Sequence, residues 1–108
     1  MARVVVRGAG DLATGVIQAL CRAGFAVVAL EVGQPSTIRR TVALSSAVTA
    51  GEAEVEDLMG VRSSFDSAKH LAGSRRGGRY VVPVLVDPEA ASLPELKPDA
   101  VVDAILAK

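Results

Sequence analysis

Hydrophobic positions along the first 32 residues follow two different periods. Residues 3–7 carry a run of valines, which predicts a strand buried on both faces, and residues 25–32 repeat this β-branched pattern. Between the two runs, apolar residues recur every three or four positions, as on one stripe of a helix, at Leu12, Ala13, Val16, Ile17, Leu20 and Cys21. The order strand, glycine turn, helix, strand predicts a right-handed βαβ unit.

The middle of the chain gives weaker signals. Residues 35–37 can open a short helix that runs to about residue 45. Residues 47–61 alternate around glycines and predict short irregular strands or a hairpin. A pattern like a capping box at residues 63–66 predicts a helix over about 64–72, followed by an exposed loop at 73–79.

In the last part of the sequence, the apolar run at residues 80–86 predicts another buried strand. Pro83 removes one ladder hydrogen bond from it and favours an edge position or a bulge. A short polar helix follows at 89–93. Residues 100–104 form a fourth strand, with a helix from 98 to 108 as the alternative. Strands alternating with helices predict an α/β protein with a Rossmann-like, mostly parallel sheet of about four strands and flanking helices.

Composition indicates one soluble domain spanning residues 1–108. Half of the 108 residues are hydrophobic, and twelve basic side chains balance twelve acidic ones, which excludes disorder and removes the electrostatic footprint of a nucleic-acid-binding protein. The apolar runs are far shorter than the about 18–20 residues that cross a bilayer, and none has the length of a signal peptide. We therefore expect a cytoplasmic protein with neither a nucleic-acid nor a membrane partner.

The single cysteine and single histidine limit the available chemistry. Cys21 has no second cysteine for an intrachain disulfide, and with His70 alone no zinc cluster can be assembled, so no metal site is predicted. Cys21 lies on the apolar stripe of the first helix and is predicted to be a small core residue rather than a nucleophile. His70 is predicted to be a surface side chain.

The glycine turn carries the strongest candidate for a binding site. Residues 8–13 match the pattern G-x-G-x-x-A and lie between a predicted strand and a predicted helix. Gly8 permits the tight turn, Gly10 leaves room for a phosphate at the backbone, and Ala13 lets the helix pack close to the strand. The start of the helix offers unpaired N–H groups to an anion.

An acidic residue occupies the position expected for ribose recognition. Glu31 lies 21 positions after Gly10, at the end of the second strand, where a carboxylate accepts hydrogen bonds from a ribose and repels a 2′-phosphate. This favours NAD over NADP. Asp11 disfavours binding, because a carboxylate that caps the helix accepts hydrogen bonds from the backbone N–H groups that a pyrophosphate needs. For a pyrophosphate to bind, the Asp11 side chain would have to turn aside. The alternative is a plain tight turn with a solvated Glu31.

Other charged residues follow the predicted strands. Arg39 and Arg40 are placed to reach an anion over the carboxyl edge of the sheet, or are plain surface arginines. Asp87 and Asp103 each end an apolar run, and a carboxylate pair there can act as acid and base or hold a metal-bearing ligand, although turn capping also explains Asp87. The remaining charges are predicted to be solvated surface: Glu52, Glu54, Glu56, Arg75, Arg76 and Arg79.

The residues at 6–15, 30–31, 34–35, 38–43, 84–88 and 97–108 together resemble the YqeB-type accessory proteins of selenium-dependent molybdenum hydroxylases. That family is similar to the Rossmann-like domain of xanthine dehydrogenase accessory proteins. The resemblance implies a maturation factor for a molybdenum hydroxylase that binds NAD, another nucleotide or a molybdopterin-type cofactor. With Ala13 of the glycine motif, the implied binding residues are Gly8, Gly10, Asp11, Thr14, Glu31, Arg39, Arg40, Asp87, Asp103 and Lys108.

Family members continue past residue 108, so the resemblance implies an N-terminal fragment or a shortened member. A sheet that stops after the fourth strand leaves an apolar edge, which predicts a homo-oligomer. Two alternatives remain open. One is an NAD-dependent oxidoreductase module that uses Asp87 and Asp103. The other is a nucleotide-sensing regulatory domain of the kind attached to potassium transporters, which the first thirty residues fit.

Overall fold

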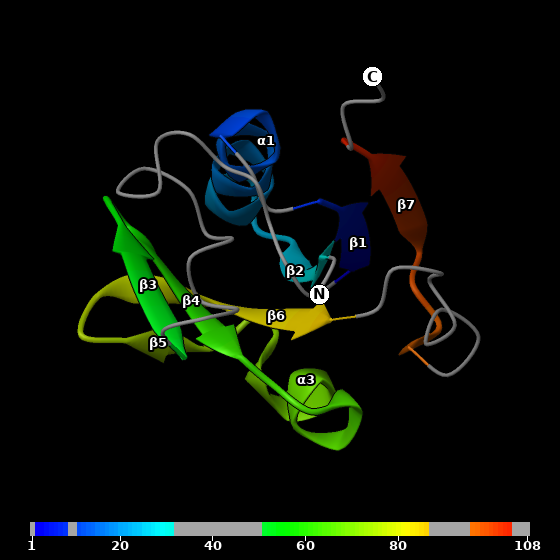
Figure 1. Cartoon of the computed structure of the whole chain (residues 1–108). Helices are drawn as coiled ribbons and strands as arrows, with labels where there is room; N and C mark the ends of the chain where they lie inside the picture. The colour runs from blue at the N-terminus through cyan, green and yellow to red at the C-terminus, as the bar shows by residue number, and fades with distance from the viewer. Residues whose placement is uncertain (1, 9–10, 32–50, 87–95, 105–108) are drawn as a thin grey trace.

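The computed structural model describes residues 2–8, 11–31, 51–86 and 96–104 (Figure 1). The elements in chain order are β1 (Arg3–Arg7), α1 (Asp11–Arg22), β2 (Ala26–Glu31), β3 (Glu52–Val55), β4 (Leu58–Arg62), α3 (Phe65–Leu71), β5 (Arg75–Arg76), β6 (Arg79–Val86) and β7 (Ala100–Asp103). The helices predicted at 35–45 and 89–93 lie outside the described residues.

The strands form one mixed sheet in the order β3-β4-β6-β2-β1-β7, with β5 paired to β6. The pairs β1–β2, β1–β7, β2–β6 and β4–β6 are parallel, whereas β3–β4 and β5–β6 are antiparallel. The sheet has seven strands, so the prediction of a Rossmann-like, mostly parallel sheet of about four strands is wrong. The additional described strands are β3, β4 and β5, of which β3 and β4 fall in the 47–61 segment and β5 was not predicted.

Among the described residues, α1 lies over one face of the sheet and α3 over the other, as Figure 1 shows. The predicted βαβ unit is confirmed, since β1 and β2 are parallel and α1 connects them. Ala13, Ile17 and Cys21 of α1 pack on one face against the buried residues Val4, Val6, Val27, Ala29, Leu58, Val82 and Val84. On the other face, Ala68 of α3 packs with Val5, Val28, Leu30, Leu85 and Leu96.

Two tight turns create the hairpins. Residues 56–57 connect β3 to β4, and Glu56 has a positive φ of 52°. This hairpin confirms one of the two forms predicted for the 47–61 segment. Gly77 and Gly78 connect β5 to β6 with φ values of 57° and 82°, the left-handed pair that a type I′ turn requires. The loop predicted at 73–79 is therefore wrong in part, because residues 75–78 are exposed as predicted but include the short strand β5.

Pro83 lies in a central strand and not at an edge as predicted. β6 has β4 on one side and β2 on the other. Pro83 is in register with Val61 of β4, but the pairing with β2 begins only at Val84. The proline therefore sits just before the second ladder starts, where its missing N–H is tolerated.

Two predicted elements toward the end of the described chain are confirmed. The helix predicted over about 64–72 is α3, but its cap is Ser64 and not Ser63, where the predicted capping box begins. The Ser64 hydroxyl accepts a hydrogen bond from the Ser67 N–H at 3.3 Å. β7 forms a strand over Ala100–Asp103, so the alternative of a helix through these residues is wrong. Arg3 and Asp99 hold the start of β7 beside β1, since the Arg3 N–H donates to Asp99 Oδ2 at 2.8 Å. Neither described helix has the length and apolarity to cross a membrane.

Candidate functional site

Three charged residues end neighbouring strands at the carboxyl edge of the sheet. β1 ends at Arg7, β2 at Glu31 and β7 at Asp103, and β1 lies between the other two. Arg7 is in register with both Leu30 and Asp103. Its guanidinium Nη1 donates to Asp103 Oδ2 at 3.1 Å, which joins the last residues of β1 and β7 across the edge.

Gly8 makes the turn from β1 toward α1. Its φ of 112° is a conformation that residues with a Cβ rarely adopt, which explains the glycine. Its N–H donates to the Leu30 carbonyl at 2.6 Å and so continues the pairing with β2. The Gly8 N–H is therefore already hydrogen-bonded within the sheet. The contribution of Gly8 to the carboxyl edge is the turn that its positive φ allows.

Ala13 and Thr14 are buried in the first turn of α1. Ala13 is 1% exposed and belongs to the core that joins α1 to the sheet, as expected for the small residue of the motif. Thr14 is 4% exposed. Both side chains are buried beneath the edge, and Glu31, half-buried at the end of β2, is the more accessible candidate.

The structure thus brings together Gly8, Glu31 and Asp103 of the predicted site. Gly10, Arg39, Arg40, Asp87 and Lys108 lie outside the described residues, and so does the side chain of Asp11, whose backbone begins α1. Arg7 was not predicted. The available signal was a charged residue at the end of a valine run, but its partner is 96 positions away, which a local pattern does not reveal.

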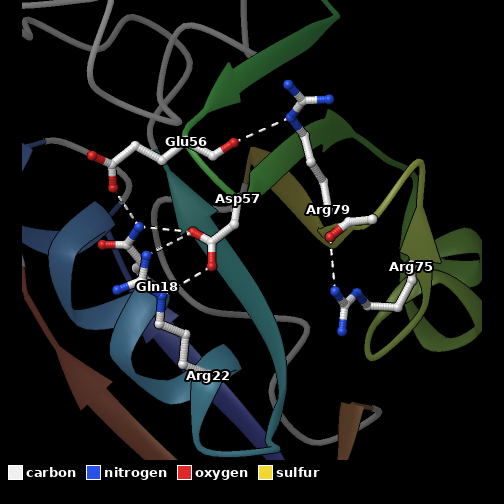
Figure 2. Close-up of polar contacts among 7 residues, drawn as sticks. Gln18, Arg22, Glu56, Asp57, Arg75 and Arg79 are labelled. Carbon is white, nitrogen blue, oxygen red and sulfur yellow. Dashed lines mark hydrogen bonds and ion pairs between the residues drawn. The ribbon is translucent and has the colours of Figure 1, made fainter.

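A polar cluster lies at the opposite, amino edge of the sheet, where α1 ends (Figure 2). Gln18 Nε2 donates to Glu56 Oε2 at 2.6 Å and to Asp57 Oδ1 at 2.8 Å. Arg22 Nε donates to Asp57 Oδ2 at 2.9 Å. The hydrogen bonds from Arg22 and Gln18 lower the pKa of Asp57 to about 2 from its ordinary 3.8. This cluster ties the β3–β4 turn to α1.

The alternating glutamates, predicted to be solvated, pair with arginines of the second hairpin. Arg76 Nη1 lies 3.1 Å from Glu52 Oε2, and Arg79 Nη2 lies 3.6 Å from Glu54 Oε2. Such exposed pairs are each worth about 1 kcal/mol at most. They neutralise the charge along the β3 edge without adding a chemical function.

The predicted core position of Cys21 and surface position of His70 are confirmed. Cys21 is 3% exposed, and burial is the largest of the causes that raise the pKa of its thiol to about 11. A neutral, covered thiol is no nucleophile. His70 is exposed. Within the described ranges, no three His, Cys, Asp or Glu side chains are grouped so that they could hold a metal ion.

The described residues define a strand-rich protein with one mixed sheet that is flanked by helices. A glycine turn and three charged strand ends lie at the carboxyl edge of this sheet. No family model and no solved structure matches the chain. The chain is 50% identical over 105 residues to the uncharacterized protein YqeB of Escherichia coli (strain K12). The match covers 97% of this chain but 19% of YqeB, so the chain spans about a fifth of that protein's length. The resemblance to YqeB is thereby confirmed.

Proposed function

We propose that the carboxyl edge of this sheet binds a nucleotide or a molybdopterin-type cofactor, and that the protein acts as an accessory factor in the maturation of a molybdenum hydroxylase. The observation that carries the binding proposal is the Gly8 turn, at a φ of 112°, with the acidic Glu31 at the end of the neighbouring strand. Ligands of sheets with parallel strands favour the carboxyl ends of those strands.

The charges at this edge suit a ligand with a hydroxylated and a phosphorylated part. The Glu31 carboxylate, which is half-buried, is an acceptor for the hydroxyl groups of a ribose. Arg7 has five N–H donors in its guanidinium, one of which bonds to Asp103, and a planar guanidinium is well suited to phosphate. The start of α1 adds a partial positive charge for the same group.

The role in hydroxylase maturation rests on the sequence resemblance rather than on geometry. We assign no reaction to the chain. Asp103 is held in an ion pair with Arg7, so we give it a positioning role and not that of an acid or base.

Calorimetric titration with NAD, NADP, ADP and molybdopterin tests the binding proposal. We expect saturable binding of at least one ligand, with NAD preferred to NADP. Glu31→Gln should weaken NAD binding by about tenfold or more, since a hydrogen bond to a charged group is worth about 1.5–3 kcal/mol. Glu54→Gln is the matched control, because Glu54 lies on β3 in an exposed pair with Arg79. Absence of saturable binding for all four ligands contradicts the proposal.

The maturation role needs a separate measurement in cells. In a strain lacking the full-length protein, we expect the hydroxylase polypeptide at normal abundance but with little molybdenum cofactor. The full-length protein should restore the cofactor content, and its Glu31→Gln form should not. Normal cofactor content in the deletion strain overturns this part of the proposal, and hydride transfer by the purified protein would instead favour the oxidoreductase alternative.

A further inference from the structure

A cavity of about 260 Å³ opens at the amino edge of the sheet, opposite the carboxyl edge described above. Its walls come from three places: the end of α1, the residue before β2, and the segment that leads through β5 into β6. The side chains used below are Cys21, Arg22, Phe25, Arg75 and Tyr80.

Two aromatic side chains and one thiol form the apolar part of the cavity. Phe25 and Tyr80 are half-buried and pack against the core on the α1 face of the sheet. Cys21 adds a covered thiol that burial keeps neutral, because its pKa lies at about 11. Two aromatic rings and a neutral sulfur make a surface suited to a planar apolar group.

The charged part of the cavity carries one net positive charge. Arg22 is neutralised by Asp57, with contacts of 2.9 and 3.3 Å. Arg75 has no carboxylate partner among the residues that the structure describes. Its guanidinium carbon lies 4.0 Å from the centre of the Tyr80 ring. Arg75 Nη2 donates to the Gly78 carbonyl at 2.7 Å, the contact drawn as a dashed line from Arg75 in Figure 2.

These two contacts fix the Arg75 guanidinium at the wall of the cavity while most of its donors remain unused. Stacking on an aromatic ring and bidentate binding of a carboxylate are compatible roles for one guanidinium, since the first uses its face and the second its edge. A single positive charge next to an aromatic wall matches a planar ligand with one negative charge.

The volume sets the size of that ligand. A cavity of about 150 Å³ is known to hold one benzene molecule, so 260 Å³ accommodates one aromatic ring with a small substituent. We propose that this cavity binds a small aromatic carboxylate, with the ring against Phe25 and the carboxylate on Arg75, which is itself stacked on Tyr80. This site is separate from the carboxyl edge and does not depend on the function proposed there.

Titration of the isotope-labelled protein with benzoate, followed by NMR, tests the proposal. We expect saturable shifts of the Phe25, Ser74 and Tyr80 amides. Benzyl alcohol, which has the ring without the charge, and inorganic phosphate, which has charge without a ring, should each bind at least about tenfold more weakly. No saturable benzoate binding, or equal binding of benzyl alcohol or phosphate, overturns the proposal.

Variants separate the cavity from a general charge effect. Arg75→Gln should weaken benzoate binding by about tenfold, and Arg75→Lys, which keeps the charge, should weaken it less. Arg79→Gln is the control, because Arg79 pairs with Glu54 and the Glu56 carbonyl and does not line the cavity. Equal affinity of the Arg75→Gln and Arg79→Gln proteins contradicts the proposal. Glu31→Gln should leave benzoate binding unchanged, so this test is independent of the carboxyl-edge test.

Discussion

Arg7 shows how a single residue can join parts of the chain that are far apart. It ends the first strand, and its guanidinium holds Asp103 at the end of β7, 96 positions later. Glu31 and Asp103 could be placed at strand ends from the sequence, because each follows an apolar run. The contact between Arg7 and Asp103 could not be predicted, because it depends on β7 pairing with β1 and not with another strand.

The hydrogen bonds of Asp57 should make the stability of the folded protein depend on pH. The Asp57 pKa of about 2 lies below the ordinary 3.8, so the charged form is favoured in the folded state. The stability this contributes is fully present above about pH 4 and is lost as the pH falls toward 2. Urea unfolding of wild type and Asp57→Asn at pH 6 and pH 2.5 measures it. The wild-type advantage should be clear at pH 6 and much smaller at pH 2.5, and a constant difference would contradict the assignment.

The elements differ in how well local sequence predicts them. β1, α1 and β2 were predicted because the change from valine runs to a helical stripe is contained within about thirty residues. The β5–β6 hairpin was missed, because two arginines before Gly77 and Gly78 give little strand signal. β6 was predicted as a strand, but its central place depends on β4, which pairs with it in parallel from the other side.

Two glycines should respond oppositely to alanine. Gly78 has a φ of 82° in the β5–β6 turn, so Gly78→Ala should destabilise the protein by about 1–2 kcal/mol. Gly15 is exposed within α1, and a Cβ at this position would meet no neighbouring atom within 4 Å, so Gly15→Ala should stabilise by about 0.5–1 kcal/mol. Urea unfolding measures both. A change of the same sign in the two variants would contradict these turn and helix assignments.

The two ends of the described sheet differ in character. The β3 end carries Glu52 and Glu54 in exposed ion pairs, which discourage another strand from adding there. At the other end, β7 pairs with β1, and its Val101 is 46% exposed. A strand with apolar exposed side chains at a sheet end is a template for pairing with a second copy. We therefore keep the prediction of a homo-oligomer and assign it to β7.

If two copies pair through β7, Val101→Lys should weaken self-association by about tenfold or more. A factor of ten corresponds to about 1.4 kcal/mol, and burying an unpaired charge costs more than that. Ala19→Lys adds the same charge to the exposed side of α1 and serves as the control. Light scattering over a concentration series reports the mass. A monomeric wild-type protein, or an equal effect of both variants, would contradict the prediction.

Binding of a cofactor at the carboxyl edge of the sheet is tested most directly by locating the ligand on the molecule. In an NMR titration with NAD or molybdopterin, we expect saturable shifts of the Gly8, Glu31 and Asp103 amides, with those of Ser74 and Tyr80 unchanged. Saturable shifts confined to the amino edge, or no saturable shift with either ligand, would contradict it.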